Sequence, residues 1–197
     1  PIRNVEVYGA NHIRHEQVEE LLLPYVSRGF FSVNIEFIRD RLIQLPWVSK
    51  IFVRRHWPDR IEGAIFEKEA VARWNGNGLL STAGEVFSPE EMGAPARFPN
   101  FVGPDGSQLH VLKYYQAMNR ILSPIHANIS YLELTPYRTW KLKMSNGILL
   151  QIGHKEILTR LSHFVKVYPK IIDTRAEDVE YVDLRYSNGV AVKWKST

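Results

Sequence analysis

The same loop sequence, Ser-Asn-Gly, occurs twice in the second half of this chain, each time between two segments in which apolar and polar residues alternate. The first copy is Ser145 to Gly147 within residues 140–152, and the second is Ser187 to Gly189 within residues 181–194. A three-residue loop whose glycine is left-handed closes an antiparallel hairpin. The repeat therefore predicts two β-hairpins, and so a β-sheet, in this half of the chain.

Side-chain chemistry predicts the register of both hairpins, because a slip of one residue would move every apolar side chain to the polar face. In the first hairpin, the expected pairs are Met144 with Ile148, Leu142 with Leu150 and Trp140 with Ile152. In the second, with Gly189 left-handed, they are Tyr186 with Val190, Leu184 with Val192, Val182 with Trp194 and, on the other face, Asp183 with Lys193. A chain that finishes on such a strand has either covered its last backbone edge or left it for a partner to extend.

The first 70 residues predict a small domain of the order strand, helix, helix, strand, strand. Alternation at residues 4–8 indicates a strand, and apolar residues at helical spacing from Val18 indicate a helix limited by Pro24 and Gly29. Asn34 is a suitable N-cap for a second helix that Pro46 stops. Strands are expected over residues 47–57 and 60–68, with two helices on one face of the sheet.

The remaining residues, 71–197, predict a mixed β-sheet domain with two helices, so that the whole chain is α+β. The Asn75 to Gly78 segment indicates a turn, and prolines between Pro89 and Pro104 indicate a loop-rich stretch. Helical periodicity predicts one helix from Ser107 to Pro124 and another from Ile157 that Pro169 closes.

Composition excludes several classes of function. The chain has 197 residues, no cysteine and a net charge of +4, so disulfides and thiolate metal sites are excluded. Its 25 basic and 21 acidic residues are interspersed, whereas nucleic-acid binders concentrate basic residues in a stripe. No run approaches the roughly 18 apolar residues of a membrane span, although an upstream membrane segment could precede the first strand.

Candidate catalytic and metal-binding groups do not form a recognisable site. His12 and His15, with Glu16 and Glu19, make only half of a metal shell and are interpreted as surface residues. His154 and His163 lie near no nucleophile motif and are interpreted as solvated helix residues. The sequence therefore predicts no catalytic residue, no metal and no cofactor.

Aromatic residues allow two interpretations. Trp47 and Trp57 flank an apolar strand, and we interpret them as core packing rather than as a ligand platform. For Tyr186 and Trp194, core packing and the anchoring of a partner at an exposed sheet edge both stay open.

Several segments form an ordered set of motifs, including Leu45-Pro-Trp-Val48, Arg54-Arg-His-Trp-Pro-Asp59 and Tyr181-Val-Asp-Leu-Arg-Tyr186. The other segments are residues 5–13, 31–34, 67–74, 84–87, 102–104, 138–140 and 164–169. Each motif alone is weak, but their order and spacing together are specific. Over nearly the whole chain the set resembles the FtsQ/DivIB family of bacterial cell-division proteins, most closely the FtsQ branch of Gram-negative bacteria.

This resemblance implies a POTRA domain over residues 1–70 and the β domain of the family over residues 71–197. It implies a non-catalytic scaffold that links early and late division proteins, binds FtsB and FtsL through the β domain and uses the POTRA domain for recruitment to midcell. It also implies a single-pass inner-membrane protein, concentrated at the septum, whose periplasmic region is this chain. Membrane contact would then be made only by a transmembrane helix upstream of Pro1.

The resemblance also implies where FtsB binds, because in this family FtsB adds a strand to the last β-strand. The residues expected to bind it are Arg138, Arg185, Tyr186, Ser187, Gly189, Val190, Ala191, Val192, Lys193 and Trp194. Tyr137 replaces a basic residue common in the family, and Arg138 is the substitute candidate for that charge contact.

Two other functions compete with this interpretation. A POTRA domain also fits a secretion or outer-membrane assembly component that binds extended client peptides. A small hydrolase would require turnover that depends on His154 or His163.

Overall fold

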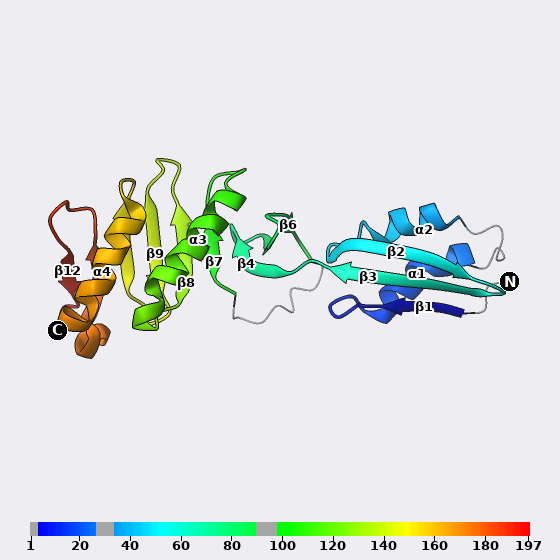
Figure 1. The fold of residues 1–197 in the computed structure, drawn as a ribbon, viewed down its shortest axis with the longest axis horizontal. Coiled ribbons are helices and arrows are strands. Elements are labelled where there is room, and N and C mark those ends of the chain that lie inside the picture. The colour runs from blue at the N-terminus through cyan, green and yellow to red at the C-terminus, as the bar shows by residue number, and fades with distance from the viewer. Residues whose placement is uncertain (1–3, 27–33, 90–97) are drawn as a thin grey trace. The chain divides into compact units, whose positions relative to one another are not determined.

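The computed structural model describes residues 4–26, 34–89 and 98–197 of the chain. The chain divides into two compact units, Pro1–Glu69 and Ala70–Thr197, each with its own hydrophobic core. Figure 1 shows that helices and strands mix within each unit, which confirms the predicted α+β class. Among the described helices, none combines the length and the apolar character needed to cross a bilayer.

The first unit has the predicted order of elements. They are β1 (Asn4–Tyr8), α1 (His15–Val26), α2 (Ile35–Leu42), β2 (Val48–His56) and β3 (Arg60–Glu67). The sheet order is β1-β3-β2, with β1 parallel and β2 antiparallel to the central strand. Apolar residues of both helices and of all three strands form one core on a single face of this sheet.

The helix ends depart from the prediction. Asn34 caps α2 as expected, because its side-chain Oδ1 accepts the Phe37 N–H at 3.2 Å, but α2 ends at Leu42, before Pro46. Pro24 lies inside α1, which continues to Val26, so the proline removes one backbone N–H donor from the helix without ending it. Gly29, the other expected limit, lies outside the described residues, as do residues 31–33 of the Phe31 motif and residues 90–97 of the proline-rich stretch.

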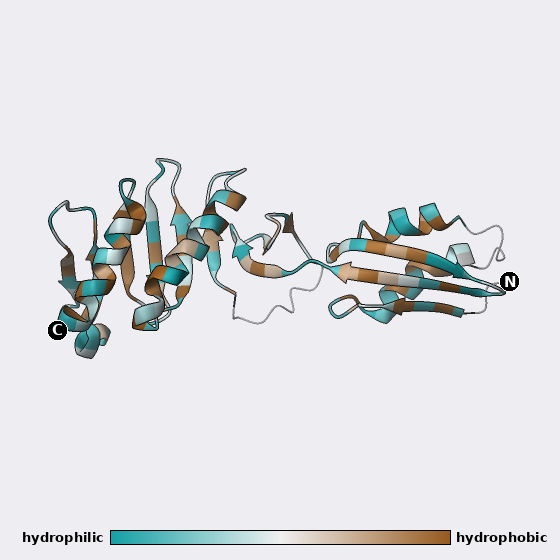
Figure 2. Cartoon of the chain, in the orientation of Figure 1, coloured by the Kyte–Doolittle hydropathy of each residue, from teal (hydrophilic) through white to brown (hydrophobic). Residues whose placement is uncertain are grey.

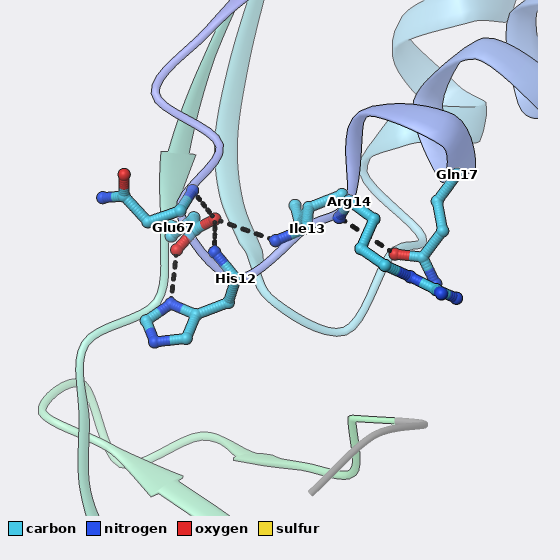
Figure 3. Close-up of polar contacts among 6 residues, drawn as sticks. His12, Ile13, Arg14, Gln17 and Glu67 are labelled. Atoms are coloured by element: carbon cyan, nitrogen blue, oxygen red, sulfur yellow. Dashed lines mark hydrogen bonds and ion pairs between the residues drawn. The ribbon is translucent and has the colours of Figure 1, made fainter. Parts of the chain in front are cut away.

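The connection between β1 and α1 is fastened to the end of β3 by one carboxylate (Figure 3). Glu67 accepts the backbone N–H groups of Asn11 at 2.6 Å and His12 at 2.8 Å, and its other oxygen lies 2.7 Å from His12 Nδ1. Burial favours the neutral acid, but these hydrogen bonds outweigh it and hold the pKa of Glu67 below its ordinary value. The His12 ring stacks on Trp47 with centroids 4.0 Å apart.

The two tryptophans that flank β2 differ in burial. Trp47 packs against the core of the first unit, as predicted. The prediction is wrong for Trp57, which is 81% exposed. Trp57 follows His56, the last paired residue of β2, and therefore lies at the turn rather than over the helices.

The second unit is a mixed sheet with two α-helices, as predicted, and its described residues form nine strands. Its elements are β4 (Ala70–Trp74), β5 (Gly78–Ser81), β6 (Val86–Phe87), β7 (Asn100–Val102), α3 (Gln108–Leu122), β8 (Ile129–Leu134), β9 (Trp140–Met144), β10 (Leu149–Gly153), α4 (Ile157–Ile171), β11 (Val179–Asp183) and β12 (Ala191–Trp194), with 3-10 turns at 123–125 and 173–178. The sheet order is β12-β11-β10-β9-β8-β7-β4-β5-β6. Residues 75–77 form the expected turn between β4 and β5.

Helices α3 and α4 lie over the same face of this sheet (Figure 1). Their buried residues recur at helical spacing, as Val111, Met118 and Leu122 do on α3, and Figure 2 shows the resulting bands of hydrophobic and hydrophilic residues. The expected end of α4 at Pro169 is wrong, since the helix continues to Ile171. Ile172 follows with 1% exposure and donates its N–H to the Tyr168 carbonyl, so burial holds the last turn in place.

The first Ser-Asn-Gly hairpin forms close to its predicted register. Leu142 pairs with Leu150, the Met144 N–H donates to the Ile148 carbonyl at 2.9 Å, and Gly147 has a φ of +94°. The expected Trp140–Ile152 pair is wrong by one residue, because a bulge between Gln151 and Gly153 places Gly153 opposite Trp140.

Candidate partner-binding edge

Strand β12 is the end strand of the nine-stranded sheet and pairs with β11 on one side. Among the described strands, none pairs with its other side. Its four residues, Ala191–Trp194, are exposed or half-buried. A free edge of this kind presents unpaired backbone donors and acceptors that an extended partner can bind.

One hydrogen bond establishes which backbone groups of β12 point outward. The Lys195 N–H donates to the Asp178 carbonyl at 2.7 Å, one residue beyond the Val179–Trp194 pair on each strand. Val179 and Trp194 are therefore a non-hydrogen-bonded pair, and the N–H and C=O of Trp194 face away from β11. Alternation along the strand gives the backbone of Val192 the same outward direction.

The second Ser-Asn-Gly hairpin departs from its predicted register by two residues. Val182 pairs with Val192 and Asp183 with Ala191, so the two strands are joined by residues 184–190 rather than by a three-residue loop. Gly189 is not left-handed. The expected pairs of Tyr186 with Val190, Leu184 with Val192 and Val182 with Trp194 are therefore wrong.

The chain leaves the ladder after Asp183 for two reasons. The Leu184 N–H donates to the Gln151 carbonyl on β10 at 2.8 Å, and the Leu184 side chain is buried. The Asp183 carboxylate accepts the backbone N–H of Arg185 at 2.9 Å, its Nε at 3.0 Å and its Nη2 at 2.7 Å. The hydrogen bonds from Arg185 hold the pKa of Asp183 below its ordinary value.

This arrangement also contradicts the predicted pair of Asp183 with Lys193. The Lys193 ammonium lies 3.5 Å from the Glu180 carboxylate and 5.5 Å from the centre of the Tyr181 ring. Both side chains of the ion pair are about half exposed, so solvent screens their attraction.

The two aromatic residues of the hairpin have different environments. Trp194 is half-buried against the core, and the Arg175 guanidinium lies 4.0 Å from the centre of its ring. Tyr186 is 61% exposed and does not join the core. The sequence left open whether these residues pack in the core or anchor a partner. Trp194 packs partly against the core, and Tyr186 does not.

A cleft of about 140 Å³ lies between α4 and the connection from β11 to β12. Tyr186, Ser187, Gly189 and Val190 of that connection line it, and so do Arg160 and His163 of α4. Sequence reasoning did not include these two helix residues in the site. Their spacing of three places them on one helix face, but only the folded arrangement shows that this face meets the connection.

The structure brings Arg185 to Trp194 together and places Arg138 elsewhere. Arg138 is an exposed residue with a φ of +62° in the turn between β8 and β9. The strand directions put this turn at the same end of the sheet as the connection from β11 to β12, as Figure 1 shows. Strands β10 and β11 lie between β9 and β12, so Arg138 is not adjacent to the edge.

His12 and His15 each contact a carboxylate. His12 binds Glu67, and His15 lies 3.3 Å from Glu19. Within residues 4–26, 34–89 and 98–197, no three His, Asp or Glu side chains gather closely enough to hold a metal ion.

Comparison with known proteins identifies both units. Residues 1–68 match the family model of the FtsQ-type POTRA domain, and residues 72–185 match that of the C-terminal region of cell division protein FtsQ/DivIB. The chain is 36% identical over 197 residues to cell division protein FtsQ of Coxiella burnetii, covering 100% of this chain and 81% of that protein.

Two further relatives agree with this result. Cell division protein FtsQ of Shewanella oneidensis is 32% identical, covering 98% of this chain and 74% of that protein. Its counterpart in Escherichia coli is 31% identical, covering 98% of this chain and 73% of that protein. The chain therefore belongs to the FtsQ/DivIB family of bacterial cell-division proteins.

Proposed function

We propose that this chain is a non-catalytic scaffold of the divisome that binds FtsB by strand addition to β12. Membership of a cell-division family supports the divisome role. The observation that carries the binding mode is the outward-facing backbone of Val192 and Trp194 on the end strand of the sheet. Main-chain hydrogen bonds to these residues supply affinity, and neighbouring side chains supply specificity.

The side chains beside this edge suit a partner strand with an apolar and an acidic residue. An apolar side chain of FtsB enters the cleft between α4 and Tyr186, where Val190 and Leu184 provide apolar surface. A carboxylate of FtsB approaches Arg185, whose side chain is 57% exposed although it binds Asp183. FtsL binds the same unit together with FtsB, and Arg138 contacts a more distant part of the bound partners.

We also propose where this protein acts in the cell. The POTRA unit binds other division proteins and recruits the chain to midcell. A transmembrane helix upstream of this region anchors the protein in the inner membrane, with residues 1–197 in the periplasm at the septum. Both matching family models are of the FtsQ type, which favours the divisome role over that of a secretion or outer-membrane assembly component.

The decisive test compares proline and alanine at position 192. Val192→Pro removes an outward N–H and should abolish binding of purified FtsB ectodomain in calorimetry, while the ladder to β11 is kept. Val192→Ala keeps that N–H and should change affinity by less than about tenfold. Circular dichroism checks that both variants are folded.

Lys193→Pro is the contrasting variant. Its N–H faces β11 by the same alternation, so this change should loosen the hairpin itself and lower the melting temperature. Unchanged FtsB affinity in folded Val192→Pro protein would exclude strand addition at this edge.

A further inference from the structure

The three-stranded sheet of the first unit has one face covered by α1 and α2 and a second face that no described element of this unit covers. Alternation along the strands assigns side chains to the two faces. Ile51, Ile61 and Ile65 point to the helices and are buried. We call the other side the open face; it carries Glu6, Tyr8, Lys50, Phe52, Arg54, His56, Arg60, Glu62, Ala64 and Phe66.

Three large aromatic residues gather at one end of the open face. Tyr8, Phe52 and Phe66 are 52%, 57% and 54% exposed. Ala64 lies opposite both Tyr8 and Phe52 in the register, and the rings of Phe52 and Phe66 meet edge to face with centroids 5.8 Å apart. A cluster of exposed aromatic side chains is unusual on a solvated surface and is typical of an interface.

On the open face, the carboxylates have polar partners, whereas two of the basic side chains do not form ion pairs with described residues. Glu6 accepts the Tyr8 hydroxyl at 2.6 Å and lies 3.4 Å from Arg60, and Glu62 lies 2.5 Å from His56. Lys50, opposite Phe66, and Arg54, opposite Glu62, form no ion pair within the described residues. In the part of the chain that the structure describes, two cations that form no ion pair therefore flank Phe52 on β2.

We propose that the open face docks an amphipathic helix of a partner protein, with an apolar stripe on Phe52, Phe66 and Tyr8 and acidic side chains beside Lys50 and Arg54. Three neighbouring strands make a surface about 14 Å wide across the strands, which is enough for one helix of about 10 to 12 Å diameter. The same sheet already packs helices on its other face. Acidic flanks on the helix complement the two free cations.

Other occupants fit the charges less well. An anionic bilayer is attracted by clusters of four or more basic residues, whereas this face has two free cations with the carboxylates of Glu6 and Glu62 beside them. A second copy of this chain would bring the same two cations to the interface, while the carboxylates of its own open face, Glu6 and Glu62, are already bound by Arg60 and His56. A separate acidic partner is therefore favoured.

This inference rests on the proposed scaffold function, since it names the POTRA surface that would receive a further partner. The probe is a synthetic amphipathic helix of about 18 residues, with leucines at i, i+3, i+4 and i+7 and glutamates beside them. A matched probe carries lysine in place of each glutamate. Both are titrated into the isotope-labelled chain, and amide shifts are followed by NMR.

The acidic probe should shift amides of β2 and β3 and bind at least about tenfold more tightly than the basic probe. Phe52→Ser with Phe66→Ser should weaken the acidic probe at least about tenfold without changing the melting temperature, because both rings are exposed. Lys50→Glu with Arg54→Glu should reverse the preference between the probes.

Several results would overturn the inference. They are equal affinity for the two probes, shifts confined to other surfaces, co-sedimentation with anionic vesicles that depends on Phe52 and Phe66, or self-association that the double serine variant removes. FtsB binding is measured on the same samples. If the chain binds FtsB normally but fails the probe test, only the docking surface is refuted. If the chain does not bind FtsB at β12, the proposed function is refuted.

Discussion

The two Ser-Asn-Gly hairpins of the second unit share a loop sequence and differ in structure. The hairpin of β9 and β10 closes over three residues, with Gly147 left-handed and both strands paired to further neighbours. The hairpin of β11 and β12 opens into a seven-residue connection, residues 184–190, and β12 has a neighbour on one side. The loop sequence thus determines the length of the turn where both strands have further neighbours in the sheet. At the sheet edge, contacts of the residues beside the loop determine that length.

The contacts around the two loops explain the difference. In the central hairpin, Asn146 Oδ1 accepts the Ile148 N–H at 3.1 Å, and the Ser145 N–H donates to the Asn128 carbonyl at 2.8 Å. These bonds support the tight loop. At the edge, Arg185 donates hydrogen bonds to the Asp183 carboxylate and the Leu184 N–H donates to the Gln151 carbonyl, and these bonds replace further pairing between β11 and β12.

Truncating the core side chains of the two hairpins should give the largest difference between them. Leu150→Ala removes a side chain with 0% exposure and should lower the free energy of unfolding by about 2 to 5 kcal/mol. Val192→Ala, on the half-buried edge strand, should cost about 1 kcal/mol or less. Urea denaturation measures both, and equal losses would show that the edge strand is as tightly packed as the central one.

Removing the Asp183 carboxylate tests whether local contacts hold the edge connection open. Asp183→Asn weakens the hydrogen bonds to Arg185 and should cost about 1 to 3 kcal/mol. NMR should then show altered amide shifts in residues 184–190 and unchanged shifts in residues 145–147. Disturbance of the central loop instead would mean that the two hairpins are coupled.

The two loop glycines make a matched pair. Gly147→Ala forces a side chain into a positive φ and should cost about 1 to 2 kcal/mol. Gly189→Ala has open space around it and no positive φ, so its effect should lie between zero and a small gain in stability. Thermal unfolding of both variants decides whether the conformations of the two loops differ in solution.

Acidification should produce the smallest effect on the two hairpins, and only on the edge hairpin. Because the pKa of Asp183 is depressed in the folded state, its contribution is present above the unfolded value and is lost as the pH falls through the folded one. Below about pH 4, the Arg185 amide should shift while the Gly147 amide does not. Parallel shifts of both amides would contradict the assignment to Asp183.

Much of the fold follows from local patterns. The β-α-α-β-β order of the first unit, the N-cap at Asn34 and the Leu142–Leu150 pair were predicted correctly, because each depends on neighbouring residues or on simple alternation. The burial of Trp57, the end of α4 at Pro169 and the left-handed conformation of Gly189 were predicted incorrectly. Their outcomes depend on where a turn points, on the burial of Ile172 and on competing contacts at a sheet edge.

Some features of the candidate site also follow from the sequence, and others depend on tertiary structure. The period of two along the last strands determines that Val182 and Val192 share a face, and this stays true although the register moves by two residues, since an even shift preserves the faces. Tertiary structure alone decides that β12 ends the sheet, that Val192 and Trp194 turn their backbone outward, and that Arg138 lies two strands away. Alternation is a property of the chain itself, whereas a free edge is defined by which strands become its neighbours.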